Sequence, residues 1–141
     1  MFSVLKDCKV SIQSLKSADN ESLTGDTLDM LGFDSVAFIA AALAGEDLTF
    51  SIKAQQGAAS DLSDAADLAG TALSFVTATG DNGLTTLEIV QPQERYVRAV
   101  TTVPNAAAAT PTVVIALQFN AKQLPLSQDG EIHVSPSEGT A

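Results

Sequence analysis

Between residues 32 and 126 the chain is a succession of short segments in which apolar and polar residues alternate, with turn residues between them. The alternation is clearest from Leu48 to Gln55, where every second residue is apolar. Successive side chains of a β-strand point to opposite faces, so this pattern predicts a half-buried strand. No helical stretch of the length needed for βαβ crossovers recurs between the segments. The pattern therefore predicts an all-β protein.

The same reasoning predicts further strands along the chain. They are Cys8–Gln13, a short one around Leu28 and Met30, Ser35–Leu43, Thr71–Thr77, Leu84–Val90, Tyr96–Val103 and Thr112–Phe119. In the first, we expect Cys8, Val10 and Ile12 on the buried side. Ser35–Leu43 is continuously apolar, which favours a strand buried on both faces, although residues 40–44 alone would suit a helix. Residues 56–70 are expected to form a loop with room for one helical turn.

Seven to nine strands with alternating patterning must bury their apolar faces against a second sheet. We therefore predict an antiparallel β-sandwich, jelly-roll-like, with short loops and an extended C-terminal tail. A chain of 141 residues suits one domain, which we place at residues 1–126. Residues 127–141 are rich in Ser, Gly and Pro and are expected to form a polar C-terminal arm.

Charge and composition narrow the function classes. A formal net charge of -10 disfavours nucleic-acid binding, which depends on cations that neutralise phosphates; the charge can equally serve solubility. One Cys and one His cannot build a disulfide or a Cys/His zinc site. The longest apolar run, Val36–Ala44, is far too short to span a bilayer. The N-terminus lacks a signal-peptide pattern, so we expect synthesis in a cytoplasm without Sec-type export.

Three aspartates, Asp61, Asp64 and Asp67, recur every three residues within the expected loop. Carboxylate oxygens at this spacing can gather around Ca²⁺, but the pattern is not that of an EF-hand. The alternative is a solvated loop that caps a short helical turn, and we favour it.

Arg95 and Arg98 flank Tyr96 in a chain that has few cations. Three residues apart on a strand, they point to opposite faces and cannot form one patch. Each is a candidate contact for carboxylates of a partner. The favoured alternative is an internal salt bridge to one of the many acidic residues.

The arm contains a second set of candidate partner contacts. Ile132 and Val134 alternate around His133 and can add a short strand to the sheet edge of a neighbouring molecule. A catalytic role for His133 is disfavoured because no nucleophile motif accompanies it. Cys8 is expected to be a small buried hydrophobe and not a reactive thiol.

The middle of the chain resembles a group of small structural proteins encoded beside the major capsid protein in tailed bacteriophages and prophages. The resemblance rests on Gly32–Ile39, Leu48–Gln55, Asp67–Thr71 and Arg95–Arg98, followed by a strand and Ala121-Lys122, over about two thirds of the chain. Some of these relatives have an aromatic residue where this chain has Ala65-Ala66, and shorter tails.

The resemblance implies a non-enzymatic virion protein that decorates and cements the capsid exterior by binding the major capsid protein, without a cofactor. It also implies a homotrimer. The alternatives are a tail- or neck-associated phage protein, or a receptor- or carbohydrate-binding module. Sugar binding is disfavoured because sugar platforms use aromatic side chains, and this chain has no Trp and one Tyr. An enzyme ranks behind these readings, and neither nucleic acid nor a membrane is an expected partner.

Overall fold

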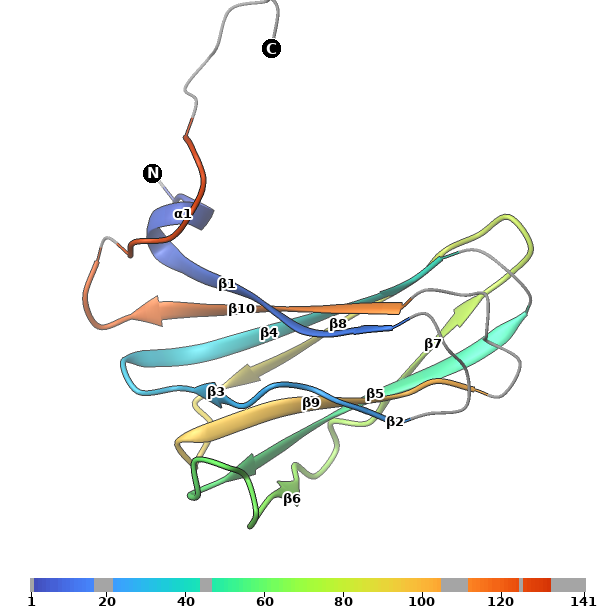
Figure 1. Cartoon of the computed structure of the whole chain (residues 1–141), viewed down its shortest axis with the longest axis horizontal. Coiled ribbons are helices and arrows are strands. Elements are labelled where there is room, and N and C mark those ends of the chain that lie inside the picture. The colour runs from blue at the N-terminus through green and yellow to red at the C-terminus, as the bar shows by residue number, and fades with distance from the viewer. Residues whose placement is uncertain (1, 17–21, 44–46, 105–111, 125, 133–141) are drawn as a thin grey trace, which may run out of the picture.

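The computed structural model describes residues 2–16, 22–43, 47–104, 112–124 and 126–132. Within these ranges the chain forms one short helical turn and ten strands (Figure 1). The elements are α1 (Val4–Asp7), β1 (Cys8–Lys16), β2 (Ser22–Thr24), β3 (Leu28–Asp29), β4 (Phe33–Ala42), β5 (Leu48–Gly57), β6 (Ala66–Asp67), β7 (Leu73–Thr77), β8 (Gly83–Val90), β9 (Tyr96–Thr102) and β10 (Thr112–Ala121). Over the same ranges, no helix is long and apolar enough to cross a membrane.

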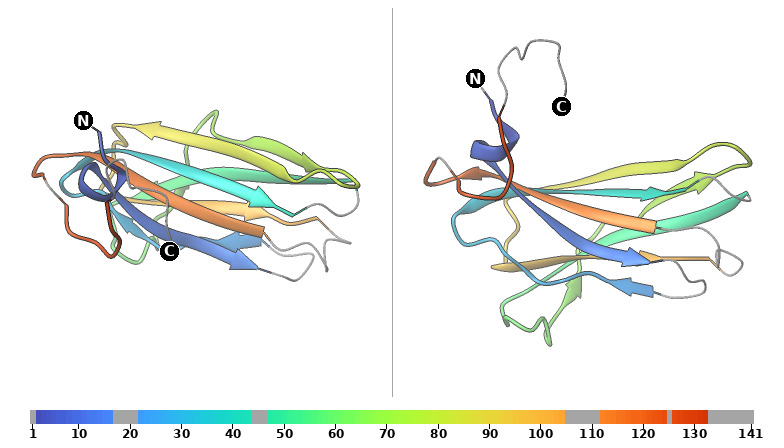
Figure 2. Two further views of the ribbon diagram at one scale, coloured as in Figure 1. Left: turned by 90° about the horizontal axis from the view of Figure 1, so that it is seen from above. Right: turned by 45° about the horizontal axis from the view of Figure 1, so that its top comes forward.

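The strands form two packed sheets, with every ladder antiparallel (Figures 1 and 2). Sheet A has the strand order β1-β10-β4-β8. Sheet B has the order β2-β9-β5-β6, with β3 also pairing with β9 and β7 also pairing with β5. The prediction of an antiparallel β-sandwich is confirmed.

The pairing order identifies the type of sandwich. β1 pairs with β10, β2 and β3 pair with β9, β4 pairs with β8, and β5 pairs with β6 and β7. The first half of the chain is thus paired with the second half in reverse order, like a long hairpin rolled into two sheets. This is the arrangement of a double-sheet jelly roll, as the sequence predicted.

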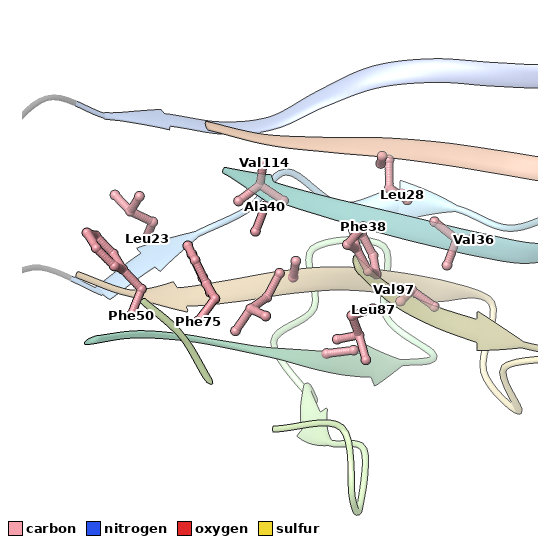
Figure 3. Close-up of a cluster of buried hydrophobic side chains, with 14 of the residues drawn as sticks. Leu23, Leu28, Val36, Phe38, Ala40, Phe50, Phe75, Leu87, Val97 and Val114 are labelled. Carbon is pink, nitrogen blue, oxygen red and sulfur yellow. The ribbon is translucent and has the colours of Figure 1, made fainter. Parts of the chain in front are cut away.

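The core lies between the inner faces of the two sheets (Figure 3). Phe38 of sheet A and Phe50 and Ile52 of sheet B are its largest fully buried apolar side chains. The rings of Phe50 and Phe75 stack with their centroids 5.2 Å apart. Aromatic pairs of this kind stabilise a core beyond the area that they bury.

β4 confirms the prediction of a strand buried on both faces over part of its length. It is an inner strand of sheet A, and four successive residues from Ser35 to Phe38 are buried. Beyond them burial alternates, and Ile39 and Ala41 on the outer face of sheet A are partly exposed. The continuous apolar run of the sequence therefore does not mean that both faces are covered along the whole strand.

β1 corrects one expectation, because Val10 and Ile12 lie on the outer face of sheet A and are exposed. A bulge between Ile12 and Ser14 places Gln13 in the interior. The Gln13 side chain donates to the carbonyl of Asp26 (2.6 Å) and accepts from the amide of Ala99 on β9 (2.9 Å). A buried amide with both ends bonded is a stable link between the sheets. Alternation identified the strand but not which of its faces points inward.

Candidate functional site

One end of the jelly roll gathers the segments with the most irregular backbone. We call it the loop end: residues 30–34 before and at the start of β4, residues 91–95 between β8 and β9, and residues 120–124 at and after the end of β10. The terminal segments, α1 and residues 126–132, lie at the same end (Figures 1 and 2). Loops 30–34 and 91–95, together with Lys122, line an open cleft of about 400 Å³.

Backbone hydrogen bonds hold the loop end together. Met30 donates to the carbonyl of Arg95 (2.9 Å), Gln91 to that of Asp34 (2.8 Å), and Lys122 to that of Gly32 (2.8 Å). Gly32, Gln91 and Asn120 all have positive φ, at 89°, 51° and 54°. Non-glycine residues hold this conformation where the surrounding bonds enforce it. The loop end is therefore a defined surface.

Arg95 lies at the loop end and is paired within the chain. Its guanidinium donates to both carboxylate oxygens of Asp29, at 2.9 and 2.8 Å, and lies 5.1 Å from the centre of the Tyr96 ring. The hydrogen bond from Arg95 lowers the pKa of Asp29 to about 2, with help from the backbone amide of Leu31. This geometry is the internal salt bridge that was favoured for Arg95. Its role as a partner contact stays a prediction.

Arg98 lies elsewhere, on the outer face of sheet B. Its Nε donates to the side-chain oxygen of Gln55 at 2.9 Å. Gln55 in turn donates to Asp67 (2.8 Å), which also accepts from Lys53 (2.7 Å). The two arginines therefore serve separate hydrogen-bonded groups, and a partner contact by Arg98 remains a prediction.

The three loop aspartates have different partners. Asp64 accepts from the amides of Ala58 (2.9 Å) and Ala59 (3.2 Å), Asp61 accepts from the amide of Ser63 (3.0 Å), and Asp67 binds Lys53. The hydrogen bonds from Ser63 lower the pKa of Asp61. In the described ranges, no three His, Cys, Asp or Glu residues are grouped so that they could hold a metal ion. The geometry is that of a loop stabilised by its own carboxylates.

The first part of the arm is attached to the body by Gln128. Its amide nitrogen donates to the carbonyls of Cys8 (2.6 Å) and Leu5 (3.1 Å), and its oxygen accepts from the amide of Val10 (3.0 Å). Leu126 adds a backbone bond to Lys6 at 2.8 Å. Sequence reasoning missed Gln128, because nothing distinguishes one glutamine in a polar stretch until its distant partners are known.

The remaining candidates lie beside this attachment or beyond it. Cys8 is buried, and burial raises the pKa of its thiol, with a smaller contribution from the charge of Asp7. A protonated buried thiol agrees with the expected small hydrophobe. Ile132 is exposed. His133 and Val134 lie outside the described residues.

Comparison with known proteins shows a likeness to a solved structure. No protein-family model and no curated protein match this chain. Among solved structures, the PBSX exported protein XepA is similar, with a TM-score of 0.56 and 13% identity. The likeness covers 93% of this chain but 43% of XepA, so this chain spans less than half the length of that protein. At this identity the likeness shows the all-β sandwich fold.

Proposed function

We propose that this chain is a non-enzymatic virion protein that decorates and stabilises a phage capsid by binding the lattice of the major capsid protein from outside. The resemblance of segments such as Gly32–Ile39 and Arg95–Arg98 supports this, as does the jelly-roll fold. A lattice offers many identical sites, so weak contacts of several linked subunits add up to strong attachment. Following the resemblance, the proposal includes a homo-oligomer, with three copies as the implied number, and no cofactor.

The anchored arm is the observation that carries the proposal. Gln128 fixes the root of the arm to the N-terminal segment, while Ile132, four residues on, is exposed. Ile132 and Val134 alternate around His133, the pattern of a strand that can join a neighbouring sheet edge. Because the root of the arm is fixed, its outer part stays close to the capsid lattice. This lowers the entropic cost of binding the arm to a neighbouring sheet edge.

The experiment is attachment to phage heads that lack this protein. The full chain, a chain ending at Ile132, and a chain with residues 133–141 replaced by nine Gly and Ser residues are mixed with such heads, and occupancy is measured by quantitative immunogold labelling. Ending at Ile132 retains the Gln128 attachment, so the body stays intact. We expect dense labelling over heads for the full chain and at least tenfold lower occupancy for both variants.

Two results would contradict parts of this proposal. Labelling confined to the neck or tail, or no labelling at all, would reject capsid decoration. Equal head occupancy for all three proteins would retain decoration and reject the arm as the contact.

A further inference from the structure

The outer face of sheet A is largely apolar. The strand register aligns Ile12 of β1 with Ile115 of β10 and Ile39 of β4, and the next row aligns Val10, Leu117 and Ala37. On the edge strand β8, Leu84 is 67% exposed on this face. On β8 these two rows end at Thr86 and Glu88. A further row is apolar from one edge of the sheet to the other and consists of Leu15, Val113, Ala41 and Leu84.

This face is more apolar than the solvent-exposed face of a typical antiparallel sheet. Such sheets normally alternate between an apolar inner face and a polar outer face. Sheet B follows that rule, since Thr49, Ser51, Lys53 and Gln55 point outward along β5. On sheet A, Glu88 is the only charged residue at the outward positions of the paired rows, although the chain has a net charge of -10. Contiguous apolar patches of this kind mark interaction sites.

We propose that this face is covered by a second copy of the chain. β4 and β10 each contain ten residues, and at about 3.3 Å per residue they are roughly 33 Å long. Four strands about 4.8 Å apart give a width of roughly 14–19 Å. The footprint is then about 500–600 Å² per copy, so a pair buries about 1,000–1,200 Å², which reaches the range of specific interfaces.

Charge and side-chain size also favour a second copy. Two molecules at -10 each can approach only through surfaces that carry little charge, and this face carries one carboxylate at its rim. Along β4, Ala37, Ile39 and Ala41 alternate small and large side chains on the outer face. Such a surface lets the side chains of two stacked sheets interdigitate.

The other occupants fit less well. Residues 133–141 contain one large aliphatic side chain, Val134, which is too little to cover the face. An anionic lipid surface would repel a chain of net charge -10, and the face lacks the basic rim of a membrane-binding surface. The pair joins two copies and is a separate contact from the three-copy assembly that the resemblance implies. It can be tested with the purified chain alone, without a capsid.

The test compares substitutions at similarly exposed residues on opposite sides of the sandwich. Ile12 on sheet A is 61% exposed and Val76 on sheet B is 62% exposed. The mass of the wild type, Ile12→Glu, Leu84→Glu and Val76→Glu is measured by sedimentation equilibrium over a hundredfold range of concentration. Circular dichroism melting checks that each variant is folded.

We expect the wild type and Val76→Glu to be oligomers with dissociation constants within threefold of each other. We expect at least a tenfold weaker constant for Ile12→Glu and for Leu84→Glu. A monomeric wild type would overturn the proposal and leave the face to a different protein. Folded Ile12→Glu and Leu84→Glu variants that associate like the wild type would also overturn it, as would equal weakening by Val76→Glu.

Discussion

The two sheets share one core but have opposite outer faces. Sheet B presents hydrogen-bonded polar side chains to the outside, such as Arg98, Gln55 and Asp67. Sheet A presents Ile12, Val10 and their apolar neighbours on β10 and β4. A sheet that is apolar on one face needs only the other sheet to be stable, whereas one that is apolar on both faces needs a further layer. The difference indicates that sheet A is the side of the molecule made for contact.

The largest expected effect comes from comparing two adjacent residues of β4 that point to opposite faces of sheet A. Phe38 is fully buried in the core, and Phe38→Ala should lower the free energy of unfolding by about 3–5 kcal/mol, since it leaves a cavity. Ile39 points outward, and Ile39→Ala should cost well under half of that in dilute protein. Urea unfolding at low protein concentration measures both. Equal losses would mean that the outer face is already packed in the single chain.

The next effect concerns the link between the sheets. Gln13→Ala removes the bonds to Asp26 and Ala99 and leaves a buried backbone amide without its partner, so we expect a loss of about 1–3 kcal/mol. The exposed Gln123→Ala is the matched control and should stay within about 0.5 kcal/mol of the wild type. Urea unfolding again provides the measurement. A Gln13→Ala variant as stable as the control would show that the amide does not hold the sheets together.

A smaller and more local effect is expected at the arm. Gln128→Ala should remove about 1 kcal/mol of local stability, because several side-chain hydrogen bonds to the N-terminal segment are lost together. Native-state hydrogen exchange should show faster exchange at Val10, with unchanged protection at Phe38 in the core. The neighbouring Ser127→Ala is the control. Unchanged exchange at Val10 in Gln128→Ala would remove the anchoring role.

The smallest effect tests the charged pair between β3 and the loop end. The folded pKa of Asp29 is about 2, below its ordinary value of 3.8. A depressed carboxyl pKa stabilises the fold above the unfolded value, and this contribution is lost as the pH falls from about 3.8 through about 2. Both partners are about half exposed, so Arg95→Gln should lower the free energy of unfolding only slightly at pH 7. Its difference from the wild type should shrink as the pH falls below about 3.8 and vanish only below about pH 2, and a constant difference across this range would contradict the pairing.

Alternation in the sequence predicted most strands and the sandwich, because in a strand with one buried and one solvent-exposed face the apolar residues recur at every second position. It also predicted that β4 is buried on both faces, which holds from Ser35 to Phe38 but not at Ile39 and Ala41. It placed Val10 and Ile12 on the wrong face. The outer face of β1 carries these apolar side chains, whereas its inner face buries the polar Gln13, so alternation alone does not identify the buried face. The sequence offered no sign of the roles of Gln13 and Gln128, whose bonding partners are 86 and up to 124 residues away. Long-range bonds of ordinary polar residues leave no local pattern to read.

The reversed pairing order has a consequence for how the chain is made. β1 leaves the ribosome before the other described strands, yet among them its neighbour in sheet A is β10, which is synthesised about one hundred residues later. β10 also separates β1 from β4, so sheet A cannot close until residues 112–121 have emerged. Folds dominated by such distant pairings form slowly, and their unpaired strands are exposed to misassembly in the meantime. During synthesis, β1 therefore has no partner in sheet A until β10 has emerged.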